Sequence, residues 1–238
     1  VSSFVILGGF DVVNYKVDSI VRTGKITKRV SLQYWTGYTN KEEYEKQLSY
    51  VPEPFADYVQ ILSPNFMGVL NADGSFAYRF SSAATPKQLV SLGQSKGARV
   101  VPLMMVTGSD ASYVLRDSTK RAAFVASTEK MLRETNADGI LVDAEALNDD
   151  VKDCLTSLMS ELYAKLHAEG KLVMMAVPAK TGDAEPSWNV EYCYKSLAPY
   201  VDYIQIMSYD YSSGTPGPIA PIDWMREVMA YSASCIPS

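Results

Sequence analysis

The sequence predicts an α/β protein with the architecture of a (β/α)8 TIM barrel, truncated after about six strand–helix units. Two observations favour this fold class. From residue 30 to the end of the 238-residue chain, short apolar runs of strand length alternate with amphipathic stretches of helix length. Such an alternation is typical of a parallel sheet with right-handed crossovers. The runs lack a nucleotide-binding glycine loop, which favours a barrel over a doubly wound sheet.

Six apolar runs are the predicted strands. Each is short, rich in large aliphatic, β-branched or aromatic residues, and separated from the next by a stretch of helical pattern or turn residues. In chain order they cover residues 30–38, 58–62, 98–105, 139–143, 171–177 and 201–207. A closed barrel of this type needs eight strands. We therefore expect the C-terminal strands to be absent from this chain.

Three of the intervening stretches predict amphipathic helices. The first begins at Thr85 and Pro86, an N-cap residue followed by a proline in the first turn, and ends near Gly97. The second covers residues 122–132. The third, residues 149–168, repeats its apolar side chains at three- and four-residue steps. Its apolar set is Val151, Cys154, Leu155, Leu158, Met159, Leu162 and Leu166.

Residues 1–29 do not fit the alternation. They contain the apolar run Phe4–Leu7, and three interpretations stay open for them: a short hairpin, an arm, or the end of a preceding domain. We therefore divide the chain into this N-terminal arm or remnant, residues 1–29, and the barrel, residues 30–238.

Composition argues against several classes of function. The net charge is −5 and the lysines are scattered among acids, which argues against a nucleic-acid partner. No apolar run reaches the roughly 20 residues that a membrane span needs. The chain has one histidine, His167, and three cysteines without a metal-binding spacing. The chain therefore has too few suitable residues for a histidine-based catalytic triad or a zinc site. We expect neither metal nor cofactor.

The candidates for chemistry are polar residues at the carboxyl ends of strands, where enzymes with this barrel gather their catalytic groups. In an extended strand, Leu141, Asp143 and Glu145 point to one side, so both carboxylates enter the barrel mouth together. Two carboxylates so close repel each other, and one tends to hold a proton near neutrality. A protonated carboxylic acid beside a carboxylate is what glycoside cleavage uses.

An alternative role for these acids is to cap the following helix. Asn148, Asp149 and Asp150 are better placed for that role, directly before the amphipathic run. We therefore favour the chemical role for Asp143 and Glu145.

The run Asp138-Gly-Ile-Leu-Val-Asp-Ala-Glu145 resembles the signature Asp-x-x-Asp-x-Asp-x-Glu of glycoside hydrolase family 18, the chitinase family. Met207-Ser-Tyr-Asp210, at the end of the sixth predicted strand, resembles the family's Met-x-Tyr-Asp motif. Both motifs fall on the strands where the family carries them, which makes the resemblance specific. Asn71–Ser75 and Gly214–Pro221 look more like one branch, the spore-cortex and peptidoglycan-lytic N-acetylglucosaminidases.

This resemblance implies retaining, substrate-assisted hydrolysis of β-1,4-linked N-acetylglucosamine glycans, with the substrate's own 2-acetamido oxygen as nucleophile. Glu145 would protonate the glycosidic oxygen and then activate water. Asp143 would hold the acetamido N–H and stabilise the oxazolinium intermediate, while Tyr209 would hydrogen-bond the acetamido carbonyl. Asp210 and Met207 would bind the sugar. No metal or cofactor is implied.

Further residues are expected to line the substrate pocket. Tyr34 and Tyr38 lie on or just after the first predicted strand, where the family places an aromatic residue under the sugar at the cleavage point. Either could be that residue, because the register of the strand is open, and packing is an equal alternative for each. Gln205 points the same way as Met207 and Tyr209 along its strand and is expected to face the pocket.

Two departures from the family pattern keep other functions open. Leu141 stands where the signature has its middle aspartate, and Ala144 where the family usually has an aromatic residue. The alternatives are a catalytically inactive, lectin-like glycan-binding protein and an unrelated barrel enzyme. Retention of Asp143, Glu145 and Tyr209 favours the hydrolase. Peptidoglycan or spore cortex is the expected polymer, with chitin second, and that substrate implies an extracellular or cell-wall location.

Overall fold

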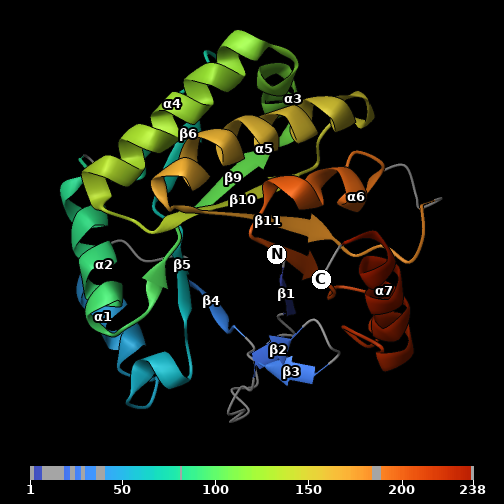
Figure 1. Cartoon of the computed structure of the whole chain (residues 1–238), viewed down its shortest axis with the longest axis horizontal. Helices are drawn as coiled ribbons and strands as arrows, with labels where there is room; N and C mark the ends of the chain where they lie inside the picture. Colours follow the sequence, from blue (N-terminus) through green and yellow to red (C-terminus); the bar gives the residue numbers. More distant parts are fainter. Residues whose placement is uncertain are drawn as a thin grey trace.

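The strands form a curved layer with helices around its outside (Figure 1). The computed structural model describes residues 3–6, 19–21, 25–27, 30–35, 41–80, 82–183 and 189–236. Two parallel sheets and two antiparallel strand pairs make up the strand content of this part of the chain. The α/β alternation that the sequence predicts is therefore confirmed.

The larger sheet has five strands, all parallel. Its order is β1 (Ser3–Ile6), β12 (Tyr203–Met207), β11 (Leu172–Pro178), β10 (Gly139–Glu145) and β9 (Leu103–Thr107). The smaller parallel sheet has the order β4 (Leu32–Trp35), β5 (Ile61–Pro64) and β8 (Arg99–Val100). The antiparallel pairs are β2 (Ser19–Val21) with β3 (Lys25–Thr27), and β6 (Met67–Leu70) with β7 (Phe76–Tyr78).

Residues 98–107 connect the two parallel sheets. Only Val101 and Pro102 separate β8 from β9, and backbone hydrogen bonds continue on both sides of the break. The Val101 N–H donates to the Leu62 carbonyl at 2.8 Å, and the Leu141 N–H donates to the Pro102 carbonyl at 2.9 Å. Proline has no N–H to donate, so it interrupts the ladder at this point. The strands therefore follow one another as in a barrel, but within the described residues they form two sheets rather than a closed barrel.

The described part of the N-terminal segment contributes one strand, β1, to the larger sheet. β1 pairs in parallel with β12, from Ser3 opposite Tyr203 to Ile6 opposite Ile206, and so forms one edge of that sheet. β2 and β3 pair antiparallel, from Ser19 opposite Thr27 to Val21 opposite Lys25. The division of the chain at residue 29 stays a prediction.

The three predicted helices are present as α2, α4 and α5, and four further α-helices accompany them. Their bounds are α1 (Lys41–Leu48), α2 (Ala84–Ser95), α3 (Gly108–Arg116), α4 (Ser118–Thr135), α5 (Lys152–Leu166), α6 (Tyr194–Leu197) and α7 (Ile222–Cys235). Thr85 is not the cap of α2, because the helix already begins at Ala84. Gly97 follows α2 with φ 83°, the left-handed conformation expected after a helix end. None of the helices described is both long and apolar enough to cross a bilayer.

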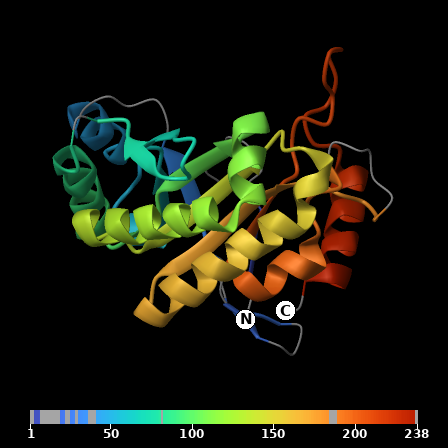
Figure 2. The same cartoon turned by 90° about the horizontal axis from the view of Figure 1, so that it is seen from above.

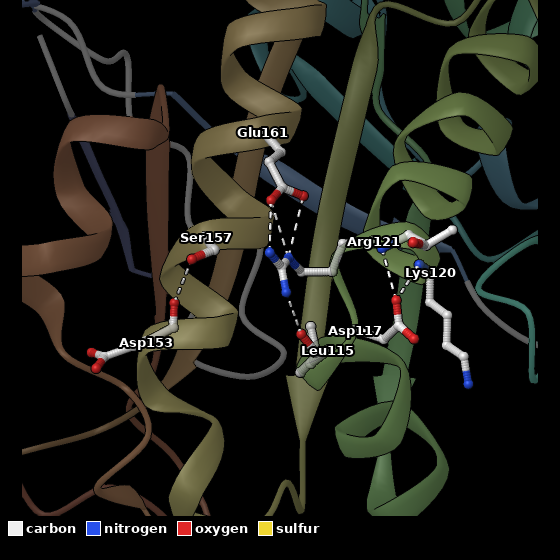
Figure 3. Close-up of polar contacts among 8 residues, drawn as sticks. Leu115, Asp117, Lys120, Arg121, Asp153, Ser157 and Glu161 are labelled. Atoms are coloured by element: carbon white, nitrogen blue, oxygen red, sulfur yellow. Dashed lines mark hydrogen bonds and ion pairs between the residues drawn. The ribbon is translucent and has the colours of Figure 1, made fainter.

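An arginine clamp joins helices α3, α4 and α5 (Figure 3). The Arg121 guanidinium donates to the Glu161 carboxylate on α5 from Nη2 at 3.0 Å and from Nε at 3.1 Å. Its Nη1 donates to the Leu115 carbonyl on α3 at 2.8 Å. Asp117 caps the start of α4 by accepting the Thr119 N–H at 2.8 Å. The helices over the middle of the strand layer therefore hold one another in place.

The strand layer separates two apolar cores. The outer core lies between strands and helices and includes Ile140, Val142 and Ala144 of β10. The smaller inner core lies on the opposite face of the strands and includes Leu141. Its other fully buried members are Leu32, Ile61, Val101, Leu103, Met174 and Ala176. Alternation along β10 therefore decides which side chains face inward.

Two aspartates at the amino ends of strands set the strand register. The Asp138 carboxylate, just before β10, accepts the Val100 N–H at 2.7 Å, and the Asp138 N–H donates to the Val100 carbonyl at 2.8 Å. Asp202, just before β12, does the same for Val173, with distances of 2.8 and 2.7 Å. Each acid therefore links two neighbouring strands directly.

Substitution of Gly139 by alanine should destabilise the fold strongly. A Cβ at Gly139 would lie 2.2 Å from the Leu172 carbonyl oxygen on β11, so the two strands would have to separate. We expect Gly139→Ala to lower the free energy of unfolding by about 2–3 kcal/mol. Gly182→Ala is the matched control, because nothing lies within 4 Å of the added methyl group. Denaturant unfolding of both variants tests this, and equal stability of the two would contradict it.

Candidate active site

The predicted carboxylates lie on the inner side of β10. Leu141 is fully buried in the inner core, whereas Val142 and Ala144 belong to the outer core. By alternation, Asp143 and Glu145 share the side of Leu141, and each is half-buried. They occupy the last inward positions of the strand, at its carboxyl end.

Strand register places other inward residues at the levels of the two acids. Asp143 is opposite Met105 on β9 and Ala176 on β11, and Ala176 is opposite Gln205 on β12. Glu145 lies one level higher, opposite Thr107. Pro178 and Met207 form a pair at the end of β11 and β12. The inward positions therefore form layers, as in barrel interiors, with polar groups concentrated in the upper ones.

A hydrogen bond from Tyr34 connects the two sheets across this inner space. The Tyr34 hydroxyl donates to Oε1 of Gln205, so a residue of β4 reaches a residue of β12. Burial raises the pKa of Tyr34 above its ordinary value, and the nearby charge of Asp143 raises it further. The hydroxyl therefore keeps its proton and acts as a donor.

In the row of Asp143, Ala176 and Gln205, two buried polar atoms have no hydrogen-bond partner within the described structure. They are Oδ1 of Asp143, an acceptor, and Nε2 of Gln205, a donor. Leaving a buried donor or acceptor unpaired costs about 1–3 kcal/mol. A buried acceptor and a buried donor of this kind suit a ligand that offers one of each.

The charges of the two carboxylates affect their neighbours. Burial raises the pKa of Asp143 to about 6, and the charge of Glu145 contributes to that rise. Burial also raises the pKa of Tyr209 to about 12, with further contributions from Asp143 and Glu145. Tyr209 therefore belongs to the same electrostatic cluster as the acids, although it lies beyond the end of β12.

The backbone is strained directly after the first motif and at the last residue of the second motif. Ala146, directly after Glu145, has φ 50°, and Asp210, directly after Tyr209, has φ 57°. The left-handed conformation costs a non-glycine residue roughly 1–2 kcal/mol. Such strain is concentrated at functional sites when the surrounding contacts support it.

The remaining predicted residues are placed less centrally. Met207 is half-buried and packs against the inner core, while Asp210 is exposed. After it the chain continues as a segment, residues 211–221, that extends away from the helices before α7 (Figure 2). Tyr38 lies outside the described residues.

The expectation that Asn148, Asp149 and Asp150 cap the following helix is wrong, because the N-cap residue of α5 is Val151 and no side chain caps that helix. Asn148 precedes a short 3-10 turn, Asp149–Val151, but its side chain makes no capping hydrogen bond. The Asp150 carboxylate is paired with Arg116 at 2.6 Å instead. His167 lies at the opposite edge of the strands, where its Nε2 is 3.3 Å from the Asp202 carboxylate.

One residue that contacts the site directly carries no signal in the sequence. The Tyr192 hydroxyl donates to the carbonyl of Ala144, between the two acids, at 2.6 Å. Tyr192 lies in an irregular segment between β11 and α6, where no periodicity indicates which side chain turns inward.

Within the described part of the chain, no group of three or more His, Cys, Asp or Glu residues could hold a metal ion.

Comparisons with known proteins found a matching family model and several similar proteins. The family model of glycosyl hydrolases family 18 matches residues 30–235. A candidate sporulation-specific glycosylase of Bacillus subtilis (strain 168), YdhD, is 30% identical over 150 residues, which are 59% of this chain and 36% of YdhD. The cortical fragment-lytic enzyme of Bacillus anthracis is 22% identical over 147 residues, 58% of this chain and 34% of that enzyme. The chain therefore spans little more than a third of these relatives.

Solved structures show the same fold. The C-terminal domain of a candidate chitinase from Desulfitobacterium hafniense DCB-2 has a TM-score of 0.82 and 34% identity, over 86% of this chain and 62% of that one. The spore cortex-lytic enzyme SleL of Bacillus cereus has a TM-score of 0.72 at 19% identity, over 87% of this chain and 48% of that one. The second likeness concerns the fold alone.

The pKa of Asp143 should depend on Glu145. We expect Asp143 to titrate at a pKa of about 6, and Glu145→Gln to lower that pKa, because a neighbouring negative charge is removed. Burial remains in the variant, so the pKa should stay above the ordinary value of about 3.9. Carboxyl 13C NMR of aspartate-labelled protein measures this, with Glu42→Gln on the surface of α1 as control. An unchanged or higher pKa in Glu145→Gln would contradict the assignment.

Proposed function

This chain belongs to the glycosyl hydrolases of family 18, and from that premise we propose that it hydrolyses β-1,4-linked N-acetylglucosamine glycans with retention of configuration. The single observation that carries the proposal is the inward cluster at the carboxyl end of β10. There, two carboxylates face a tyrosine and a glutamine, and one buried acceptor and one buried donor lack partners.

The free acceptor and donor are suited to an acetamido group. Oδ1 of Asp143 would accept the acetamido N–H, and Nε2 of Gln205 or the hydroxyl of Tyr209 would donate to the acetamido carbonyl. An amide presents one donor and one acceptor, so it would satisfy both buried groups at once. Tyr34 supports this arrangement by fixing the other end of the Gln205 amide.

In the proposed first step, the acetamido oxygen attacks the anomeric carbon and the glycosidic bond breaks. Glu145, one level above Asp143 and nearer the mouth, transfers its proton to the departing oxygen. Asp143, as the carboxylate, stabilises the positive oxazolinium ion that forms. In the second step Glu145 takes a proton from water, the water oxygen attacks the anomeric carbon, and the acetamido group is restored. Two inversions give net retention.

Peptidoglycan or spore cortex is the proposed polymer. The names of YdhD and of the Bacillus anthracis enzyme support a glycan of the spore or cell wall. Chitin is the second candidate, which the Desulfitobacterium hafniense domain supports. Such a substrate places the proposed site of action outside the cell or at the wall.

A catalytically inactive, glycan-binding protein is the second candidate function. Leu141, fully buried in the inner core, favours it, because Asp143 has no carboxylate neighbour one level below. Glu145 still provides a charged neighbour one level above, and for that reason we favour the hydrolase.

We also infer that the two sheets form an arc of a (β/α)8 barrel. The order of successive parallel strands supports this, as does the likeness to the Desulfitobacterium hafniense domain over most of this chain. The family match from residue 30 onward supports a division between residues 1–29 and 30–238.

Replacement of Glu145 should abolish hydrolysis and leave binding intact. Removing a general acid–base group costs roughly 10²–10⁴-fold in rate, so we expect Glu145→Gln to lose at least that much. Product analysis with N-acetylglucosamine oligomers and muropeptides, alongside calorimetric binding, measures both properties. Glu42→Gln on α1 is the control.

The outcomes of that experiment distinguish the hydrolase from the inactive, glycan-binding protein and test the role of Glu145. Cleavage by the wild type and by Glu42→Gln, but not by Glu145→Gln, supports the hydrolase, and the cleaved glycan identifies the polymer. Equal cleavage by all three proteins would refute the role of Glu145. Binding without cleavage by the wild type would favour the inactive, glycan-binding function.

A further inference from the structure

A tyrosine outside both motifs contacts the end of β10, the strand that carries Asp143 and Glu145. Tyr192 lies in the segment between β11 and α6, and its side chain is almost completely buried, with 2% exposed. Its hydroxyl donates to the Ala144 carbonyl at 2.6 Å. Ala144 separates the two acids of the site, so this bond acts on the backbone that carries them both.

The bond occurs where pairing between β10 and β11 ends. The last pair between these strands is Asp143 with Ala176, so Ala144 lies beyond it. Two residues further on, Ala146 adopts φ 50°, which turns the chain away from the strand direction. Strained backbone persists only when neighbouring contacts hold it. The Tyr192 hydroxyl provides such a contact two residues before the strained residue.

The backbone of Tyr192 is itself held from β11. Lys180, two residues after β11, is 4% exposed, and its Nζ donates to the carbonyl of Tyr192 at 3.3 Å and of Asn189 at 3.5 Å. The Tyr192 N–H donates to the Asn189 carbonyl at 3.2 Å. A chain of contacts therefore runs from the end of β11 through Lys180 and Tyr192 to the end of β10.

The hydroxyl remains a donor under all ordinary conditions. Burial raises the pKa of Tyr192 above its usual range, and the charges of Glu191, Glu145 and Asp143 raise it further. A neutral phenol must donate in order to bond a carbonyl oxygen, which has no proton of its own. The direction of this hydrogen bond is therefore defined.

We propose that Tyr192 is a positioning residue, which orients Glu145 and Asp143 by holding the carbonyl of the residue between them. The proposal rests on the proposed function only for its kinetic consequence. Holding a catalytic group in place matters because a misplacement of about 1 Å can cost roughly 100-fold in rate.

Tyr194 offers a matched control in the same segment. It is equally buried, and its hydroxyl donates to the Pro178 carbonyl at the end of β11. The end of β11 carries no carboxylate, so loss of the Tyr194 hydroxyl removes a comparable bond without acting on the acids.

The test compares Tyr192→Phe, Tyr194→Phe and Lys180→Met with the wild type. We expect Tyr192→Phe to lower kcat by roughly 10- to 100-fold with KM changed less than about threefold. Lys180→Met should lower kcat in the same direction by a smaller factor, and Tyr194→Phe should leave kcat within about threefold. Thermal unfolding of each variant shows whether the two phenylalanine variants lose similar stability.

A second readout does not depend on activity. In Tyr192→Phe the Glu145 carboxylate is freed to move away from Asp143, so we expect the pKa of Asp143 in 13C NMR to fall below the wild-type value. Tyr194→Phe should leave that pKa unchanged. A wild type without activity would refute the proposed function. The pKa of Asp143 would still test whether Tyr192 positions the acids.

Two results would overturn the proposal. One is an equal loss of kcat in Tyr192→Phe and Tyr194→Phe, which would indicate a general loss of structure. The other is a folded Tyr192→Phe with the wild-type pKa of Asp143. If Tyr192→Phe does not fold, an unchanged Asp143 pKa in folded Lys180→Met overturns the proposal instead.

Discussion

The hydrogen bonds of Asp138 fix the register of β10, and the inward placement of Asp143 and Glu145 depends on that register. Its carboxylate and backbone N–H bind Val100 on one neighbour, and its carbonyl accepts the Leu172 N–H on the other. A slip of one residue would turn the inward side chains of β10 outward. Asp143 and Glu145 would then lie in the apolar outer core, where unpaired charges are very costly. The first aspartate of the family signature is therefore a structural residue in this chain.

Asp202 fixes the register of β12, the strand that carries the second motif, in the same way. Because its carboxylate holds Val173 of β11, Gln205 comes level with Ala176, and hence with Asp143 two strands away. The two motifs are far apart in the sequence, and these two aspartates bring them into register. The Tyr34 hydrogen bond to Gln205 then adds the smaller sheet to the same site.

The electrostatics of the site follow from what surrounds each acid. Leu141 fills the position one level below Asp143 with an apolar side chain, so burial is the largest cause of the raised pKa of Asp143 and Glu145 is the charged contributor. An aspartate at that position would give Asp143 a second negatively charged neighbour, one level below. Strain at Ala146 and Asp210 limits how far the ends of both motifs can move, provided that contacts such as that of Tyr192 hold them.

Sequence alone was sufficient for the alternation of strands and helices and for the side of β10 that carries the acids. Both follow from local periodicity, which a chain displays without any partner. The tertiary structure was needed for the contact of Tyr34 with Gln205, for the pairing of β1 with β12, and for the role of Tyr192. Those features join segments distant in sequence, and Tyr192 lies in a segment without periodicity. Their geometry is set by strand register and loop path, which no local pattern encodes.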